Sequence, residues 1–375
     1  MSQKSYNNLG AFLALVRAGL WEKEARLLLF GEVDYEEVMR LAEEQSVVGL
    51  VTAGLEHIVD EKVSQEYLLQ FIGQSLQLEQ KNSSMNNFIG ELIENMRHEG
   101  IYAILVKGQG IAHCYERSLW RSCGDVDLLL SHENYDKAKA LLVPLANSLE
   151  TEWGYQKHLS MTLDQWVVEL HGSLRTQLSA KVDGLIDKTQ KAVFFEGGVR
   201  SWMNGKIQVF LPSADNDAIF IFTHFLKHFY KGGLGLRQIC DWCRLLWTYR
   251  DVIDAGQLEK QIRKAGLMTE WKAFGAFAVD VLGMPMEAMP MYSSSHRWKR
   301  KAQKIQDFIL MSGNMGHNRE KSYEEYPYFI KKACSMGRRI SDVVNHTRIF
   351  PLDSIRFLGS IVIHGILDAV RDWSD

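Results

Sequence analysis

The sequence predicts an α+β protein, with a mixed β-sheet core between an N-terminal helical region and a mainly helical C-terminal domain. Residues 1–98 place apolar side chains at steps of three and four, as helices do. Residues 99–211 contain short apolar or alternating runs typical of strands, and residues 212–375 return to the helical period. A chain of 375 residues can bury more than one core, so we expect three units divided near residues 98 and 211.

The composition is that of an ordinary globular protein, with 46% hydrophobic and 24% charged residues. A formal net charge of −3 argues against a protein whose whole surface binds nucleic acid. No apolar run reaches the ~20 residues that a membrane span needs, and the N-terminus lacks the pattern of a secretory signal. We therefore expect a cytoplasmic protein without a membrane partner.

The first hundred residues read as consecutive helices. Apolar periodicity predicts helices over 9–18, 35–45, 47–55 and 66–97. Gly100 ends the last of them, and a β-rich run over 101–106 follows directly. We interpret this region as a helical platform for the core rather than as a chemical site.

Residues 101–130 contain the most informative stretch of the chain. A strand over 101–106 leads through Lys107 and Gly108 into a short helical segment, and a second strand begins at Asp125 and Asp127. Alternation along a strand puts these two aspartates on one face. Neighbouring carboxylates repel each other unless a cation lies between them, and Mg²⁺ binds such oxygen pairs together with phosphates. Because of this repulsion, we expect Asp127→Asn to leave the fold intact or slightly stabilised.

Residues 131–171 are expected to complete the sheet. Ser131 has the position of an N-cap for a helix to about residue 148, which Pro144 shortens or kinks. Strands are predicted over 155–161 and 166–170, with a hairpin turn between them. Alternation puts Glu169 and His171 on one face, so three carboxylates converge if that face is shared with the aspartates. A further hairpin is predicted at Asn204-Gly205.

The order of these features resembles the nucleotidyltransferase superfamily that includes DNA polymerase β. In that layout a strand turns through glycine into a helix and a second strand contains a D-x-D motif. Here the motif reads VKGQGIAHCYERSLWRSCGDVDLLL. It is similar to one branch, in which Lys-Gly replaces Gly-Ser, an arginine precedes the D-x-D by four residues, and a later strand has an E-x-H motif. The resemblance covers roughly residues 85–245.

The resemblance implies a nucleotidyltransferase-like fold and a Mg²⁺- or Mn²⁺-dependent enzyme that moves NMP from an NTP to an acceptor hydroxyl. The acceptor, which could be a protein, an RNA, a sugar or a small molecule, is not identified. The Lys-Gly pair removes a hydroxyl that usually helps to bind phosphates. The catalytic and metal-binding residues implied are Asp125, Asp127 and Glu169, and the nucleotide-binding residues are Lys107, Gly108, Arg121, His171 and Arg237.

Two other functions use the same residues. A member of the superfamily could keep the pocket as a nucleotide-binding or regulatory module, in a toxin–antitoxin or polysaccharide-associated system, without transferring anything. A metal-dependent phosphohydrolase would need an activated water and no acceptor. The complete set of three acids favours the transferase.

The C-terminal half contains a helical H-x-x-x-H pair, His224 and His228. The spacing suits two metal ligands, but the acid that follows the first histidine in zinc proteases is missing, so helix histidines near a polar site are favoured. The branch commonly shows such a helix followed by one with a basic residue and an aspartate, here Arg237 and Asp241. These two could form an ordinary helical ion pair, or Arg237 could meet an anionic substrate.

For two further motifs a structural role is favoured over a functional one. Cys240 and Cys243 lie inside a helical pattern without a second cysteine pair, so buried thiols are favoured over a zinc or redox site. A basic segment could bind RNA or another polyanion, but a solvated helix face is favoured. Its basic residues are Arg297, Lys299, Arg300, Lys301 and Lys304.

Overall fold

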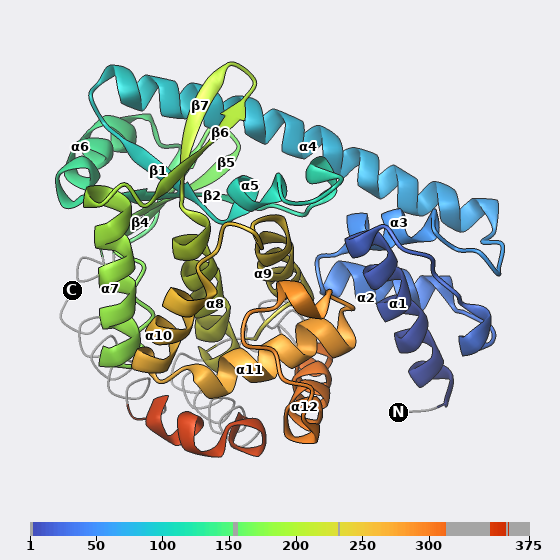
Figure 1. Cartoon of the computed structure of the whole chain (residues 1–375). Coiled ribbons are helices and arrows are strands. Elements are labelled where there is room, and N and C mark those ends of the chain that lie inside the picture. Colours follow the sequence, from blue (N-terminus) through green and yellow to red (C-terminus); the bar gives the residue numbers. More distant parts are fainter. Residues whose placement is uncertain (1–2, 153–156, 232, 313–345, 358, 360–375) are drawn as a thin grey trace, which may run out of the picture.

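The centre of the molecule is a five-stranded mixed sheet with strand order β1-β2-β5-β4-β3. The computed structural model describes residues 3–152, 157–231, 233–312, 346–357 and 359. β2 and β5 are parallel, and the other neighbouring pairs are antiparallel. The expected α+β class with a mixed sheet is confirmed (Figure 1). The strands are β1 (Ala103–Val106), β2 (Asp125–Leu130), β3 (Ser148–Leu149), β4 (His158–Leu163) and β5 (Trp166–His171).

One face of this sheet is apolar. Val126 and Leu128 of β2 share a hydrophobic cluster with Met85 and Ile89 of α4 (Gln65–His98), and Tyr135 of α6 (His132–Leu142) belongs to the same cluster. Figure 1 shows α4 as a long helix across the top of the sheet. Because side chains alternate along a strand, Asp125 and Asp127 must project from the other face. Burial of the apolar face against α4 and α6 therefore determines the side of the sheet on which the aspartates lie.

The polar face is directed toward the helices of the C-terminal half. Figure 1 shows α8 and α9 beneath the sheet, with the hairpin of β6 and β7 rising beside α4. After the sheet, the chain continues through α7 (Ala180–Phe195), β6 (Val199–Asn204), β7 (Ile207–Pro212), α8 (Ala214–Lys231), α9 (Leu236–Thr248), α10 (Ala255–Ala265), α11 (Met268–Ala276) and α12 (His296–Ser312).

The N-terminal helices pack closely on one another and on the C-terminal half. A Cβ added at Gly19 would lie 1.9 Å from the Leu50 carbonyl oxygen, so α1 and α3 approach nearly to backbone contact. Trp21 Nε1 donates to the Leu282 carbonyl oxygen at 2.6 Å, which joins the end of α1 to the C-terminal half. These helices are α1 (Gln3–Trp21), α2 (Tyr35–Glu44) and α3 (Val48–Leu55).

Most predicted elements are present, with small shifts of their ends. The Ser131 hydroxyl accepts from the Asn134 amide at 3.3 Å, as expected of an N-cap, and α6 ends before a 3₁₀ turn that contains Pro144. The 204–205 hairpin is also confirmed, as β6 and β7. The helix α7 was not predicted, although Ser179 caps it and it buries Val182, Leu185, Ile186, Thr189 and Val193 at helical spacing. Expected structure over 323–345 and beyond 359 lies outside the described residues.

Candidate active site

Three carboxylates converge on the polar face of the sheet. Asp127 of β2 lies beside Glu169 of β5 in the register of the parallel pair, and Asp125 precedes Asp127 on the same face. Each of the three offers an oxygen, and these oxygens lie within 4.8 Å of one another. The alternation of the two strands thus brings the acids together, while their catalytic and metal-binding roles stay predictions.

Lys107 enters this cluster from the end of β1. Its Nζ donates to Asp127 Oδ1 at 2.7 Å. Burial opposes the charged amine, but the charges of Asp127 and Glu169 outweigh it and raise the pKa of Lys107. The backbone turns sharply here, with φ of 57° at Lys107 and 43° at Gly108. A Cβ at position 108 would lie 3.3 Å from the Cys123 Sγ, so glycine lets the turn pass close to the D-x-D strand.

Two histidines complete the hydrogen-bonded network. His171 Nε2 lies 2.7 Å from Asp127 Oδ1 and 3.3 Å from Glu169 Oε2. His158 of β4 lies beside His171, with its Nε2 3.1 Å from Glu169 Oε2. Burial would lower the pKa of His171, but its hydrogen bonds to Asp127 and Glu169 raise it above the ordinary value.

The three acids differ in their electrostatic surroundings. The charge of Asp127, and then burial, raises the pKa of Asp125. Burial acts against the ionised Asp127 as well, but Lys107 and His171 hold the pKa of Asp127 below its usual value. Hydrogen bonds from His158 and His171 lower the pKa of Glu169 in spite of burial. The expected repulsion therefore describes Asp125, whereas Lys107 and His171 stabilise the ionised Asp127 through contacts that the alternation of side chains along a strand does not predict.

Arg121 is engaged away from the carboxylates. Its Nε and Nη2 donate to the two oxygens of Asp241 at 2.9 and 2.7 Å, and both side chains are buried. Tyr115 also donates to Asp241, at 2.8 Å. The helical ion pair expected between Arg237 and Asp241 is thus replaced by a pair across 120 residues. A contact of Arg121 with a triphosphate stays a prediction, and in this structure the guanidinium joins the loop before β2 to α9.

Arg237 lies nearer to the acids. Its Nη1 donates to the Ser122 carbonyl oxygen at 2.9 Å, and its buried Nε has no hydrogen-bond partner. The positive charge of Arg237 acts on Asp125, where it opposes the rise in the pKa of that carboxyl. Of the two arginines, Arg237 is the one with a free donor close to the carboxylates.

The histidine pair of α8 forms the opposite wall. His224 and His228 lie with their Nε2 atoms 3.0 Å apart. Burial and the charge of Lys107 lower the pKa of His224, and burial and the charge of Lys227 lower that of His228 to about 3. Among the described residues, neither histidine belongs to a group of three or more metal-ligating side chains. This agrees with the favoured interpretation, two helix histidines near a polar site.

Most of the chain matches one known protein family. The model of the uncharacterised nucleotidyltransferases matches residues 31–283, a span that contains every site residue described above. The chain belongs to this uncharacterised nucleotidyltransferase family. No curated protein and no solved structure matches it. In the described part of this family member, no helix is long and apolar enough to cross a membrane.

Two residues of the candidate site, His158 and Lys227, were not predicted from the sequence. His158 could have been found by counting back from the two-residue turn between Leu163 and Trp166, which places it opposite His171. Lys227 lies between the histidines of α8, and burial and the charge of Lys107 lower its pKa. No sequence motif distinguishes Lys227 from an ordinary exposed helix lysine.

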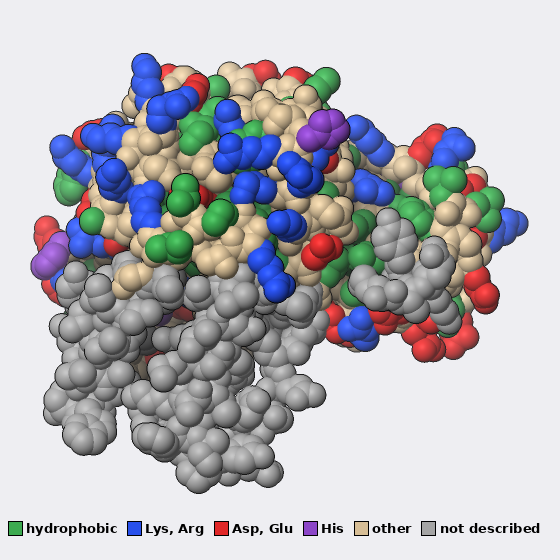
Figure 2. All heavy atoms as spheres, turned by 90° about the horizontal axis from the view of Figure 1, so that it is seen from below, with side chains coloured by type: hydrophobic (Ala, Val, Ile, Leu, Met, Phe, Trp, Pro, Cys, Tyr) green, Lys and Arg blue, Asp and Glu red, His purple; other side chains and the backbone are tan. Residues whose placement is uncertain are grey.

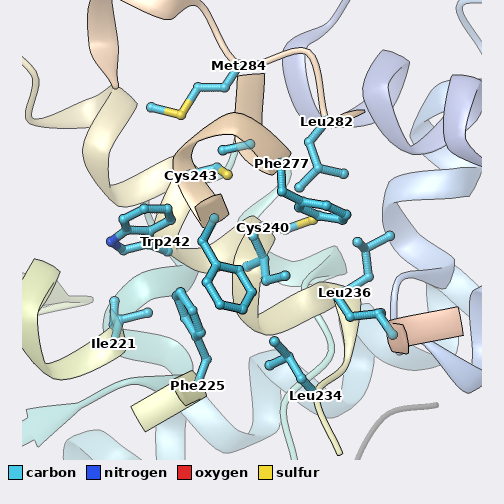
Figure 3. Close-up of a cluster of buried hydrophobic side chains, with 14 of the residues drawn as sticks. Ile221, Phe225, Leu234, Leu236, Cys240, Trp242, Cys243, Phe277, Leu282 and Met284 are labelled. Carbon is cyan, nitrogen blue, oxygen red and sulfur yellow. The ribbon is translucent and has the colours of Figure 1, made fainter. Parts of the chain in front are cut away.

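The thiol pair of α9 belongs to the core. Cys240 and Cys243 are free and buried, and Figure 3 shows them among Trp242, Phe277 and Met284. Burial raises the pKa of both thiols, which keeps them neutral. This apolar setting agrees with the interpretation as structural thiols.

The basic segment forms part of α12. Lys301 donates to the Ile349 carbonyl oxygen and Lys304 donates to that of Arg348, so both fasten the helix to the chain near residue 350. Figure 2 shows the face from below, where Lys and Arg side chains are interspersed with apolar and acidic ones. The exposed basic side chains of the segment are Arg297, Lys299, Arg300 and Lys304.

Proposed function

We propose that this family member is a nucleotidyltransferase of the DNA polymerase β superfamily, dependent on Mg²⁺ or Mn²⁺, that transfers NMP from an NTP to an acceptor hydroxyl. The observation that supports it best is the convergence of Asp125, Asp127 and Glu169, whose oxygens lie within 4.8 Å of one another. In the reaction the acceptor oxygen attacks the α-phosphorus, the bond to the β-phosphate oxygen breaks, pyrophosphate leaves, and the hydroxyl proton passes to solvent.

The residues fit a hard divalent ion. Carboxylate oxygens are the protein ligands that Mg²⁺ prefers. The charge of Asp127 raises the pKa of Asp125, an unfavourable arrangement that a bound cation would relieve. When bound, the metal supplies charge neutralisation on the phosphates and a lower pKa of the attacking hydroxyl. Asp125, Asp127 and Glu169 would hold it.

The chain itself supplies a cationic frame around the acids. Lys107, Lys227 and Arg237 all act electrostatically on this cluster, from β1, α8 and α9 respectively. Arg237 has a buried Nε without a partner, and Lys227 has no hydrogen bond among the described residues. In phosphoryl and nucleotidyl transfer, a protein acts mainly by positioning reactants and balancing charge. We assign Lys107 and Arg237 to the phosphates of the NTP.

A second candidate is a nucleotide-binding module without transfer activity. Lys107 and His171 both contact Asp127 Oδ1 at 2.7 Å, and a binding module could use this arrangement as well as an enzyme. It differs from the enzyme in one measurable way, because ligand would stabilise the protein without being consumed.

The test is incubation of the purified protein with each of the four α-labelled NTPs, Mg²⁺ or Mn²⁺, and cell lysate. Transfer of label to a protein, RNA, sugar or small molecule, lost in Asp125→Asn, would support the transferase. Label released as free NDP or NMP with no labelled acceptor would indicate a phosphohydrolase. A rise in melting temperature with intact NTP would indicate the binding module.

A further inference from the structure

A second set of ligands shares Glu169 with the three carboxylates. His158, Glu169 and His171 each offer one ligand atom, and these atoms lie within 4.8 Å of one another. Glu169 Oε2 is 3.1 Å from His158 Nε2 and 3.3 Å from His171 Nε2. Both imidazoles thus contact the same carboxylate oxygen, Glu169 Oε2.

The sheet fixes this arrangement. β4 and β5 are antiparallel with His158 directly opposite His171, and the two rings stack with centroids 4.8 Å apart. Glu169 lies two residues before His171, so alternation puts it on the same face. The His158 side chain is 27% exposed and the Glu169 side chain 26%, whereas that of His171 is only 9% exposed. The cluster is therefore supported by the ladder and opens to solvent on one side.

The donor set differs from the all-oxygen set in the metal that it favours. Mg²⁺ prefers oxygen ligands, whereas imidazole nitrogen suits the later first-row transition ions such as Co²⁺, Ni²⁺, Cu²⁺ and Zn²⁺. Two imidazoles and one carboxylate form a common three-residue set for such ions, with the remaining positions open to water or substrate. In this structure the two Nε2 atoms are hydrogen-bonded to carboxylates, that of His158 to Glu169 and that of His171 to Asp127.

We propose that His158, His171 and Glu169 form a distinct metal position that takes a divalent transition ion in preference to Mg²⁺. It lies beside the position made by Asp125, Asp127 and Glu169, and Glu169 bridges the two. This inference deepens the proposed function, because it names the class of the second ion. The binding itself can be measured without any nucleotide.

The experiment uses the full-length, tag-free protein, stripped with a chelator. Co²⁺ is added and its visible absorption is followed, with Mg²⁺ titrated separately by calorimetry. His158→Gln is expected to weaken Co²⁺ binding at least tenfold and to change Mg²⁺ binding less than twofold. His57→Gln is the matched control, because His57 pairs with Glu22 at 2.7 Å and its side chain is 26% exposed. Equal Co²⁺ affinity in wild type and His158→Gln would overturn the proposal.

A second measurement needs no variant. Cu²⁺ bound to the wild type at one equivalent should show coupling to two imidazole nitrogens in pulsed electron paramagnetic resonance, because Cu²⁺ favours nitrogen ligands. Cu²⁺ without this nitrogen coupling would overturn the proposal. Nitrogen coupling without labelled transfer would leave this metal position standing and remove the transferase. Labelled transfer without nitrogen coupling would support the transferase and exclude this metal position.

Discussion

The molecule contains two histidine pairs with opposite surroundings. His158 and His171 lie across two strands around Glu169, and hydrogen bonds to carboxylates raise the pKa of His171. His224 and His228 lie one turn apart on α8, and burial together with Lys107 and Lys227 lowers the pKa of both. The first pair faces acids and the second faces ammonium groups.

The charges around a histidine pair, rather than its spacing in the sequence, determine whether the pair can bind a metal. The i, i+4 pair has the spacing of two metal ligands, but the nearby charges that act on it most strongly are cationic. The pair that meets a carboxylate is separated in the sequence and becomes a pair only through the β4–β5 register. A neutral, buried α8 pair instead suits a wall for an anionic substrate.

The largest expected effect comes from Glu169→Gln, which tests whether one carboxylate serves both metal positions. An amide oxygen is a poorer ligand than a carboxylate. We expect nucleotidyl transfer to fall about a thousand-fold or more, and Co²⁺ absorption to be lost as well. Labelled transfer and Co²⁺ titration measure the two effects. Transfer within tenfold of wild type would show that the acid of the first histidine pair is not needed for the chemistry.

The next largest effect is on stability and tests whether the partners of Arg121 give it a structural role. Arg121→Met leaves Asp241 buried without its guanidinium, and we expect the free energy of unfolding to fall by about 3–5 kcal/mol. Urea unfolding in a chelator measures it, and the double variant Arg121→Met/Asp241→Leu should recover much of the loss. A small change in stability together with loss of NTP binding would instead make Arg121 a phosphate ligand, as the family resemblance implied.

A smaller effect separates the two aspartates. Asp127→Asn removes the charge that Lys107 and His171 both contact, and we expect a loss of roughly 2–3 kcal/mol in the free energy of unfolding. For Asp125, repulsion from Asp127 together with burial outweighs the attraction of Lys107 and Arg237, so the stability of Asp125→Asn should equal or slightly exceed that of wild type. Melting curves without metal compare the two variants. Equal destabilisation would show that the environments of the two carboxylates do not differ as described.

The smallest effect concerns the second histidine pair and pH. The folded pKa of His228 is about 3, below the ordinary value of 6.5, so the unfolded chain binds the proton between these values and the folded chain does not. Acidification therefore lowers the free energy of unfolding. Between pH 7 and 4, His228→Gln is expected to lose roughly 1–3 kcal/mol less than wild type.

Urea unfolding at pH 4, 5, 6 and 7 provides the measurement for His228. His57→Gln, in the N-terminal helices, controls for the loss of an imidazole. A His228→Gln profile parallel to that of wild type would mean that the α8 pair is protonated in the folded protein, and the contrast between the two histidine pairs would disappear.

Local patterns predicted much of the fold and the acids of the site. Alternation of apolar and polar side chains placed Asp125 and Asp127 on one face and Glu169 on its strand, because strand geometry depends on neighbouring residues alone. The N-terminal helices were found for the same reason. The convergence of the three acids then followed from the pairing of β2 with β5.

The hydrogen-bond partners of the site residues could not be predicted from local sequence patterns. Asp241 meets Arg121 rather than Arg237, because packing of α9 against the loop before β2 brings together groups that are 120 residues apart. His158 reaches Glu169 only through the strand register. The helix α7 was overlooked although its buried residues follow a helical period, since Gly184 and Thr189 weaken its intrinsic propensity.

The parallel pairing of β2 and β5 has a consequence for how the protein is made. β1 and β2 are close together in the sequence, so Lys107 and Asp127 leave the ribosome one shortly after the other. Glu169 follows about forty residues after Asp127, behind α6 and β4. Its docking closes a long loop, which is slower than forming a local hairpin. During synthesis Lys107 and Asp127 can therefore pair early, and the nascent chain gains its complete set of carboxylates only when β5, paired with β4 as a hairpin, docks against β2.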